Sequence, residues 1–298
     1  MASYTDVHFP SAAIPGKDGP DENGRLTLYA RDYGVPFDGA PSVLCLHGLT
    51  RNSADFEWIA GHLSDRYRVV VADQRGRGRS QWDPVPAHYS PAVYVQDMLG
   101  LLDHLGIARA AVIGTSMGGL MAMVLGVAAR DRLSGAVIND VGPDIEAAGL
   151  ARIASYTGKT KPIANWADAA ETARLINEVA FPDYGPDAWA AFARRLFREE
   201  GGVPVPAYDP AIAAGLKPQS DTPVAPPDLW PMWDGLQGLP ILAIRGGLSD
   251  LLSAATVDKM AEHHAGMIAV TVPNRGHAPM LDEPEAVAAI DAFLAGLS

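Results

Sequence analysis

Short apolar runs alternate with helical patterns along most of this chain, and this alternation limits the possible folds more than any other feature. The runs have the length and composition of strands buried on both faces of a parallel sheet. They are 42–46, 69–72, 110–113, 135–138, 241–244 and 268–272. Residues 26–33 instead alternate apolar and polar residues, as an edge or hairpin strand would. Helical patterns lie at about 53–63, 91–105, 117–129, 256–264 and 284–297. We therefore predict an α/β fold, with a mostly parallel central sheet that carries helices on both faces.

Residues 142–235 interrupt this alternation, because they contain helical patterns and loops but no buried-strand signal. Asn165 is a candidate N-cap for a helix ending near Phe181, and Pro186 could open another. Prolines then recur from Pro204 to Pro231, where regular structure is not expected. The predicted organisation is a core of residues 24–141 and 236–298, with residues 142–235 inserted as a helical cap or lid.

Charge and cysteine content limit the partners and the compartment. The formal net charge of −12 repels nucleic acid and anionic membranes, so we expect neither as a partner. Cys45 is the only cysteine and lies in an apolar run, which favours a buried thiol and excludes an intrachain disulfide. Residues 1–21 lack the apolar block of a signal peptide, and the apolar stretch at about 120–129 is too short to span a bilayer. A cytoplasmic protein is expected, with no indication of its oligomeric state.

Ser116 is the candidate nucleophile. It lies in the sequence Gly114-Thr115-Ser116-Met117-Gly118, between a predicted strand and a predicted helix. This is the G-x-S-x-G pattern of a nucleophile elbow, in which glycines allow the backbone to approach itself closely. The pattern also occurs by chance as a tight turn, but its place between strand and helix favours the catalytic interpretation. The spacing fits neither a dinucleotide loop nor a phosphate loop.

His277 is the candidate base, because a serine hydroxyl needs an adjacent base to become a nucleophile. It follows the predicted strand 268–272, at the carboxyl end where sites form in open α/β sheets. His263 and His264 also lie downstream of Ser116, but on a predicted amphipathic helix where we expect them to be exposed. A metal site built from Glu262 and these two histidines is not expected, because adjacent residues on a helix point in different directions.

Two aspartates are candidates for the acid that orients the base. Asp250 follows the predicted strand 241–244 and is our preferred acid, whereas Asp140 follows the strand 135–138 and is the alternative. Either carboxylate would hold the imidazole tautomer and stabilise the imidazolium.

The backbone N–H groups of Leu49 and Met117 are the predicted oxyanion hole. Leu49 belongs to the sequence His47-Gly48-Leu49, which ends the strand 42–46, and Met117 follows the nucleophile. His47 precedes Ser116 in the chain, so we interpret it as scaffold rather than as the base.

These motifs together resemble the α/β-hydrolase family, in its serine-nucleophile branch, over nearly the whole chain. The family order is kept by His47-Gly48-Leu49, the run Asp73–Ser80, the Ser116 elbow and Gly276-His277. The resemblance implies that the arginine-rich run Asp73–Ser80 is structural. It also implies a helical cap after the sixth strand that forms no independent domain, and it calls for no cofactor and no metal.

The resemblance further implies hydrolysis of a small-molecule substrate, and a small, largely apolar ester or lactone is our leading expectation. Family members that cleave carbon–carbon bonds use the same triad and form the alternative. A ligand receptor that has kept the triad without catalysis is a third possibility. Because family caps commonly cover an apolar pocket, we expect one of three tryptophans to touch the substrate. The three candidates are Trp189, Trp230 and Trp233.

Overall fold

A mixed sheet forms the centre of the molecule in the computed structural model, which describes residues 2–14, 25–159, 162–216 and 228–297. Its strand order is β1-β2-β4-β3-β5-β6-β9-β10. The strands are β1 Thr5–Pro10, β2 Thr27–Asp32, β3 Ser42–Leu46, β4 Arg68–Asp73, β5 Ala110–Thr115, β6 Leu133–Asn139, β9 Ile241–Gly246 and β10 Ile268–Val272. The predicted strands are confirmed, and β1 is an additional strand at the edge.

Parallel pairing runs from β4 to β10, whereas β1 and β2 pair antiparallel at one edge. The central strands have buried residues on both faces, as their apolar runs predicted. Cys45 is among these buried residues. Parallel pairing brings the carboxyl ends of β3, β5, β6, β9 and β10 to one edge of the sheet, and this edge carries the candidate site.

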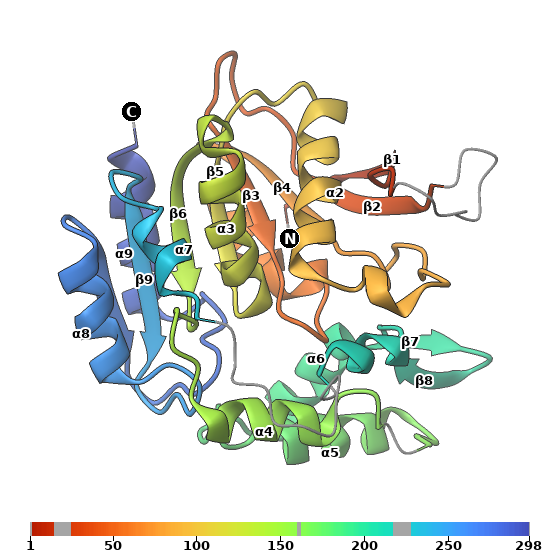
Figure 1. The fold of residues 1–298 in the computed structure, drawn as a ribbon. Helices are drawn as coiled ribbons and strands as arrows, with labels where there is room; N and C mark the ends of the chain where they lie inside the picture. Colours follow the sequence, from red (N-terminus) through yellow and green to blue (C-terminus); the bar gives the residue numbers. More distant parts are fainter. Residues whose placement is uncertain (1, 15–24, 160–161, 217–227, 298) are drawn as a thin grey trace.

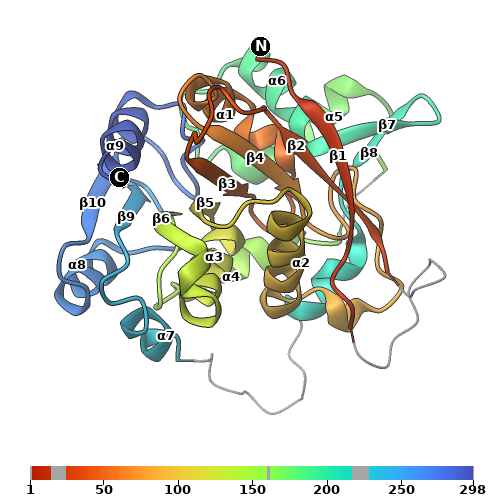
Figure 2. The ribbon, with the colours of Figure 1, turned by 90° about the horizontal axis from the view of Figure 1, so that it is seen from above.

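Helices cover both faces of the sheet, as Figure 2 shows. The first face carries α2 Pro91–His104, α3 Met117–Ala128, α7 Trp230–Asp234 and α8 Ala254–His263. The second face carries α1 Glu57–Leu63 and α9 Pro284–Ala295. Two buried apolar clusters correspond to these faces, one packed under α2 and α3 and the other under α1 and α9. Gly106, just past α2, has a positive φ of 66°, a conformation in which helices commonly end on glycine.

A second group of elements lies across the carboxyl ends of the strands (Figure 1). It contains α4 Ala147–Tyr156, α5 Trp166–Asn177, α6 Pro186–Leu196 and the hairpin of β7 Phe197–Glu200 and β8 Val203–Pro206. Asn165 caps α5 through its side chain, and Pro186 opens α6, as predicted. The hairpin contradicts our expectation of no strands here, because its strands are short and largely exposed and so lack an apolar run. Residues 217–227 of the proline-rich stretch lie outside the described residues.

No helix in the described part of the chain is both long and apolar enough to cross a membrane.

Candidate active site

Ser116 lies on a sharp turn between β5 and α3, with φ 54° and ψ −116°. This backbone conformation is rare for residues other than glycine and presents the side chain at the top of the turn. The flanking glycines allow the close approach that the turn needs. A Cβ on Gly114 would collide with the carbonyl of Gly118, and a Cβ on Gly118 would collide with the carbonyl of Leu46. The turn therefore has the geometry of a nucleophile elbow.

The imidazole of His277 lies against Ser116, with its Nε2 2.9 Å from the serine Oγ. The histidine follows β10 in a loop that packs closely against the segment around Ala180. The N–H of Gly276 donates to the carbonyl of Ala180 at 2.8 Å, and a Cβ on Gly276 would stand only 2.7 Å from the Cα of Ala180. The His277 side chain is 7% exposed, so little water competes for its two ring nitrogens. The structure thus brings Ser116 and His277 within hydrogen-bond distance, and their catalytic roles stay a prediction.

Asp140, not Asp250, contacts the other ring nitrogen of His277. Its Oδ2 lies 2.8 Å from Nδ1, and the same oxygen accepts from the Ser249 hydroxyl at 2.7 Å. Its Oδ1 accepts from the Gly246 N–H at 2.7 Å. The Asp140 side chain is fully buried and its φ is 57°, a turn that directs the carboxylate towards β9 and the histidine. The alternative acid is thus in place, and our preference for Asp250 was wrong.

Asp250 instead pairs with an arginine on α4, one of the elements that lie over the strand ends. Arg152, on α4, forms a two-point ion pair with its carboxylate at 2.6 and 2.8 Å. The hydrogen bonds from Arg152 keep the pKa of Asp250 below its ordinary value. The Asp250 carbonyl also accepts from the N–H of Gly149, at 3.0 Å. Asp250 therefore attaches α4 to the loop that follows β9. This ion pair accounts for the position of Asp250 near the site, although Asp250 forms no hydrogen bond with His277.

The predicted oxyanion donors are the N–H groups of Leu49, in the loop after β3, and of Met117, which directly follows Ser116. Within the part of the chain that the structure describes, neither N–H donates a hydrogen bond to another residue. Met117 is also the first residue of α3, where the helix dipole favours negative charge. Their lack of a partner among the described residues supports the predicted role as an oxyanion hole, which stays a prediction.

His47 holds the loop that carries Leu49. Its Nδ1 lies 2.7 Å from the carbonyl of Gly48, and its Nε2 accepts from the N–H of Gln74 at 3.0 Å. The ring is fully buried, and burial lowers its pKa to about 3. A neutral ring that donates from Nδ1 and accepts at Nε2 satisfies both contacts. His47 is therefore scaffold, as predicted.

A cavity of about 330 Å³ opens onto Ser116 and His277. Its wall is mostly apolar and comes from both the strand ends and the overlying elements. The overlying residues include Ile153 and Tyr156 of α4, Leu175 and Ile176 of α5, and Leu196 and Phe197 at the start of the hairpin. Besides Ser116 and His277, polar side chains at the wall are Thr50, Arg51, Asp55, Thr115, Ser155, Lys159, Thr172, Asn177 and Tyr208. The aromatic pocket residues, Phe56, Tyr156, Phe197 and Tyr208, were not among our candidates.

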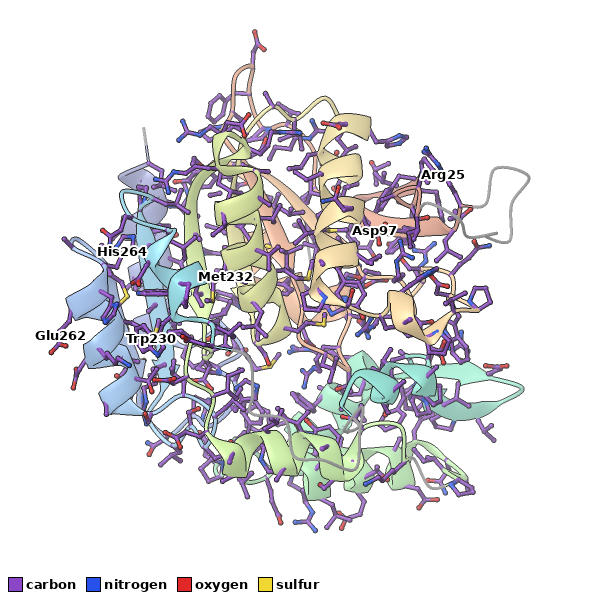
Figure 3. The ribbon with its side chains drawn as sticks, viewed as in Figure 1. Arg25, Asp97, Trp230, Met232, Glu262 and His264 are labelled. Carbon is purple, nitrogen blue, oxygen red and sulfur yellow. The ribbon has the colours of Figure 1, made fainter. Side chains whose placement is uncertain are left out.

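None of the three candidate tryptophans lines this cavity. Trp189 packs on Phe181 and Phe192 inside the apolar cluster of α5 and α6. Trp233 is fully buried, and its Nε1 donates to the carbonyl of Met260 on α8. Trp230 stacks near His263 and Lys259, on the α7 and α8 side of the molecule (Figure 3). The expectation was wrong because aromatic residues on helices fill the helix interfaces here.

The residues Glu262, His263 and His264 point in different directions, as expected. Glu262 extends outward from α8, whereas His264 lies on the inner side (Figure 3). His263 pairs with Asp234 at 2.7 Å. His264 is 2% exposed and contacts the carbonyl of Leu236, so our expectation that it is exposed was wrong.

An elbow serine, a histidine and a buried aspartate thus lie together at the carboxyl edge of a mostly parallel sheet. A model of the alpha/beta hydrolase family matches residues 43–290. The chain belongs to this family. The fold and the predicted resemblance are therefore confirmed.

Two named relatives and one solved structure are similar to this α/β-hydrolase over most of its length. The chain is 33% identical to a 3-hydroxybutyrate-oligomer hydrolase of Cupriavidus necator, over 89% of this chain and 92% of the relative. It is 29% identical to a 2-(acetamidomethylene)succinate hydrolase of Mesorhizobium japonicum, over 85% and 86%. A crystal structure of an alpha/beta hydrolase from Novosphingobium aromaticivorans is 40% identical, with a TM-score of 0.87 and 99% of both chains covered.

Proposed function

We propose that this α/β-hydrolase cleaves a small, largely apolar carboxylic ester or lactone through an acyl-enzyme intermediate. One observation carries the proposal: Ser116 and His277 line a mostly apolar cavity, and hydrogen bonds of 2.8–2.9 Å join Ser116, His277 and the buried Asp140. Residues 24–141 and 236–298 would supply this chemistry. Residues 142–235 would act as the cap that closes the cavity, without forming an independent domain.

In the first half of the reaction, the Ser116 Oγ bonds to the ester carbonyl carbon while its proton passes to Nε2 of His277. The carbonyl electron pair moves onto oxygen, and the N–H groups of Leu49 and Met117 stabilise that charge. Asp140 stabilises the imidazolium and keeps the Nδ1 proton in place. Collapse of the tetrahedral intermediate expels the alkoxide, which takes the proton from Nε2.

In the second half, a water molecule gives a proton to His277 and attacks the acyl carbon. The second tetrahedral intermediate expels Ser116 Oγ, which recovers its proton from Nε2, and the carboxylic acid leaves. A lactone follows the same steps, except that the alcohol and the acid leave as one hydroxy acid.

Hydroxy-acid esters are the first substrates to test. The relative from Cupriavidus necator is named for hydrolysis of 3-hydroxybutyrate oligomers. Such an oligomer combines apolar repeats with a free carboxylate at one end. The cavity of this chain offers an apolar wall for the repeats, and its exposed Lys159 offers a cation for the carboxylate.

Steady-state rates on p-nitrophenyl esters, lactones and hydroxybutyrate dimers test the proposal, with Ser116→Ala as the matched variant. We expect Ser116→Ala to lower kcat by at least about a thousandfold while circular dichroism stays unchanged, since the nucleophile is lost. Retention of ester hydrolysis by Ser116→Ala would exclude the proposed mechanism. Slow turnover of every ester, together with fast cleavage of meta-cleavage products, would instead assign carbon–carbon hydrolysis.

A further inference from the structure

The side chain of Arg77 is buried directly behind the two oxyanion donors. The residue lies in the loop after β4 and is 0% exposed. Its Nε donates to the carbonyl of Leu49 at 2.9 Å, and its Nη2 lies 3.6 Å from the Sδ of Met117. One guanidinium therefore contacts both residues whose N–H groups face the reacting carbonyl.

The charge of Arg77 has no carboxylate in contact with it among the described residues. Its remaining hydrogen bonds, from Nη1, go to the carbonyl of Arg75 and to the hydroxyl of Tyr94, both at 2.8 Å. The guanidinium also lies 4.8 Å from the centre of the Tyr94 ring and 5.5 Å from that of Tyr89. Every partner of this cation is a neutral dipole or an aromatic ring.

Arg75, two residues earlier, shows the contrasting arrangement. It is equally buried but binds Asp97 of α2 through two hydrogen bonds, and a third hydrogen bond goes to Asp83. Figure 3 places Asp97 on α2, on the side of the helix that meets this loop. The buried charge of Arg75 is thus neutralised by contacting carboxylates, which is the usual arrangement for a buried structural arginine. Arg77 lacks this arrangement, although it lies in the same loop.

Tyr89, whose ring lies beside Arg77, connects this cation to the carboxylate of Asp209. The Tyr89 hydroxyl donates to Asp209 at 2.5 Å, and burial raises the pKa of Tyr89, so the phenol stays neutral. In a water-poor interior a charge that is not neutralised by contact acts over a longer distance than it does in water. The positive field of Arg77 therefore reaches the place where the oxyanion forms.

We propose that Arg77 is a positioning residue of the oxyanion hole, whose uncompensated buried charge favours the tetrahedral intermediate over the bound ester. The hydrogen bond to Leu49 orders the loop that carries one donor, and the contact with Met117 ties this loop to the start of α3. The positive charge adds to that of the helix N-terminus at the same point. This inference rests on the proposed acyl-enzyme function.

Three variants separate charge from shape. Arg77→Lys keeps the charge, Arg77→Gln keeps a donor for the Leu49 carbonyl without charge, and Arg77→Met keeps only the length of the side chain. Tyr94→Phe is the matched control, because it removes one hydrogen bond to Arg77 and leaves the cation in place. Each variant is assayed for kcat, for KM, and for affinity towards a trifluoromethyl ketone, which forms a tetrahedral adduct with the serine.

We expect Arg77→Gln and Arg77→Met to lower kcat by about tenfold to a hundredfold, with KM within about threefold of the wild type. Their affinity for the trifluoromethyl ketone should fall by the same factor, whereas affinity for the product acid should not. Arg77→Lys should recover most of this loss, and Tyr94→Phe should stay within about threefold of the wild type. If Arg77→Met does not fold, Arg77→Gln carries the comparison.

A neutral variant with kcat within threefold of the wild type would overturn the proposal, as would a lysine variant as slow as the neutral ones. A rise in KM equal to the fall in kcat/KM would also overturn it, since that is the sign of lost ground-state binding. Failure of the proposed function looks different, because the wild-type protein itself would then hydrolyse no ester and Ser116 would not react with a fluorophosphonate.

Discussion

At the scale of single residues, the carboxylate of Asp140 is fully engaged. Its two oxygens accept hydrogen bonds from the Gly246 N–H, from the Ser249 hydroxyl and from Nδ1 of His277. Such a carboxylate has little freedom to rotate, so it presents one oxygen to the imidazole in a set direction. Ser249 had no place in our sequence interpretation, because its role depends on the contact between two loops.

Asp140→Asn is predicted to lower kcat by on the order of a thousandfold or more, because an amide does not stabilise the imidazolium and can hold the wrong tautomer. Asp250→Asn should change kcat less than about fivefold, and should cost at most about 1 kcal/mol of unfolding free energy, because its ion pair is partly exposed. Ester hydrolysis by the two purified variants, with urea unfolding alongside, makes the comparison. Equal losses of kcat in both would contradict the assignment of Asp140.

His47 predicts a pH dependence of stability. Its pKa is about 3 in the folded protein against an ordinary value of 6.5, so the unfolded chain binds more protons between these two values. The unfolding free energy should therefore fall as the pH is lowered through this window, by up to about 1.4 kcal/mol per pH unit from this group. Urea unfolding from pH 7 to pH 4.5 should show a smaller slope for His47→Gln than for the wild type, and identical slopes would refute the prediction.

At the scale of elements, the strand, turn and helix around Ser116 act as one unit. The strand β5 is buried, the helix α3 begins directly after the nucleophile, and the turn between them passes close to β3. Gly114 and Gly118 are required because neighbouring backbone leaves no room for a Cβ, and not because the turn must be flexible. The position of Ser116 thus depends on the packing of α3 against two strands.

Gly118→Ala is predicted to destabilise the fold and to displace the nucleophile, because its Cβ would collide with the backbone of Leu46. A cost of about 1–3 kcal/mol or more is expected from such overpacking. Gly100→Ala on α2 is the matched control, since its Cβ would meet nothing within 4 Å and alanine favours helix. Thermal unfolding and ester hydrolysis are measured for both, and equal behaviour of the two variants would contradict the argument.

At the scale of the whole molecule, the proposed mechanism draws chemistry and selectivity from different parts of the chain. The sheet edge would supply the serine, base, acid and amide donors, and α4, α5 and the hairpin contribute a large part of the apolar wall above them. The ion pair between Arg152 and Asp250 connects these parts at α4. Substitutions on α4 should therefore change which esters are accepted more than how an accepted ester is cleaved.

Ile153→Trp is predicted to reduce the volume of the cavity and to lower kcat/KM for an octanoate ester at least about tenfold more than for an acetate ester. Leu150→Trp is the control, because Leu150 lies on the exposed side of the same helix. Rates on p-nitrophenyl esters of graded acyl length make the measurement. Parallel loss on all esters would indicate that the variant disturbs the triad rather than the pocket.

Local patterns were sufficient for the fold class, for the strands of the main sheet other than β1 and for the placement of Ser116 beside His277. Buried strands, helix ends and the elbow are encoded by neighbouring residues, so one sequence reveals them. The proposed oxyanion donors come from the same reasoning, because their strands end at the same edge of the sheet.

Only the tertiary structure distinguished Asp140 from Asp250, and only it identified the residues of the pocket. Both aspartates follow neighbouring parallel strands, and the choice depends on backbone angles and on contacts between segments about a hundred residues apart. The tryptophans were misplaced for the same reason, since the face of a helix that meets a cavity is set by its partners. The role of Arg77 also belongs to the tertiary structure, because burial without a contacting carboxylate is a property of its surroundings and not of its sequence.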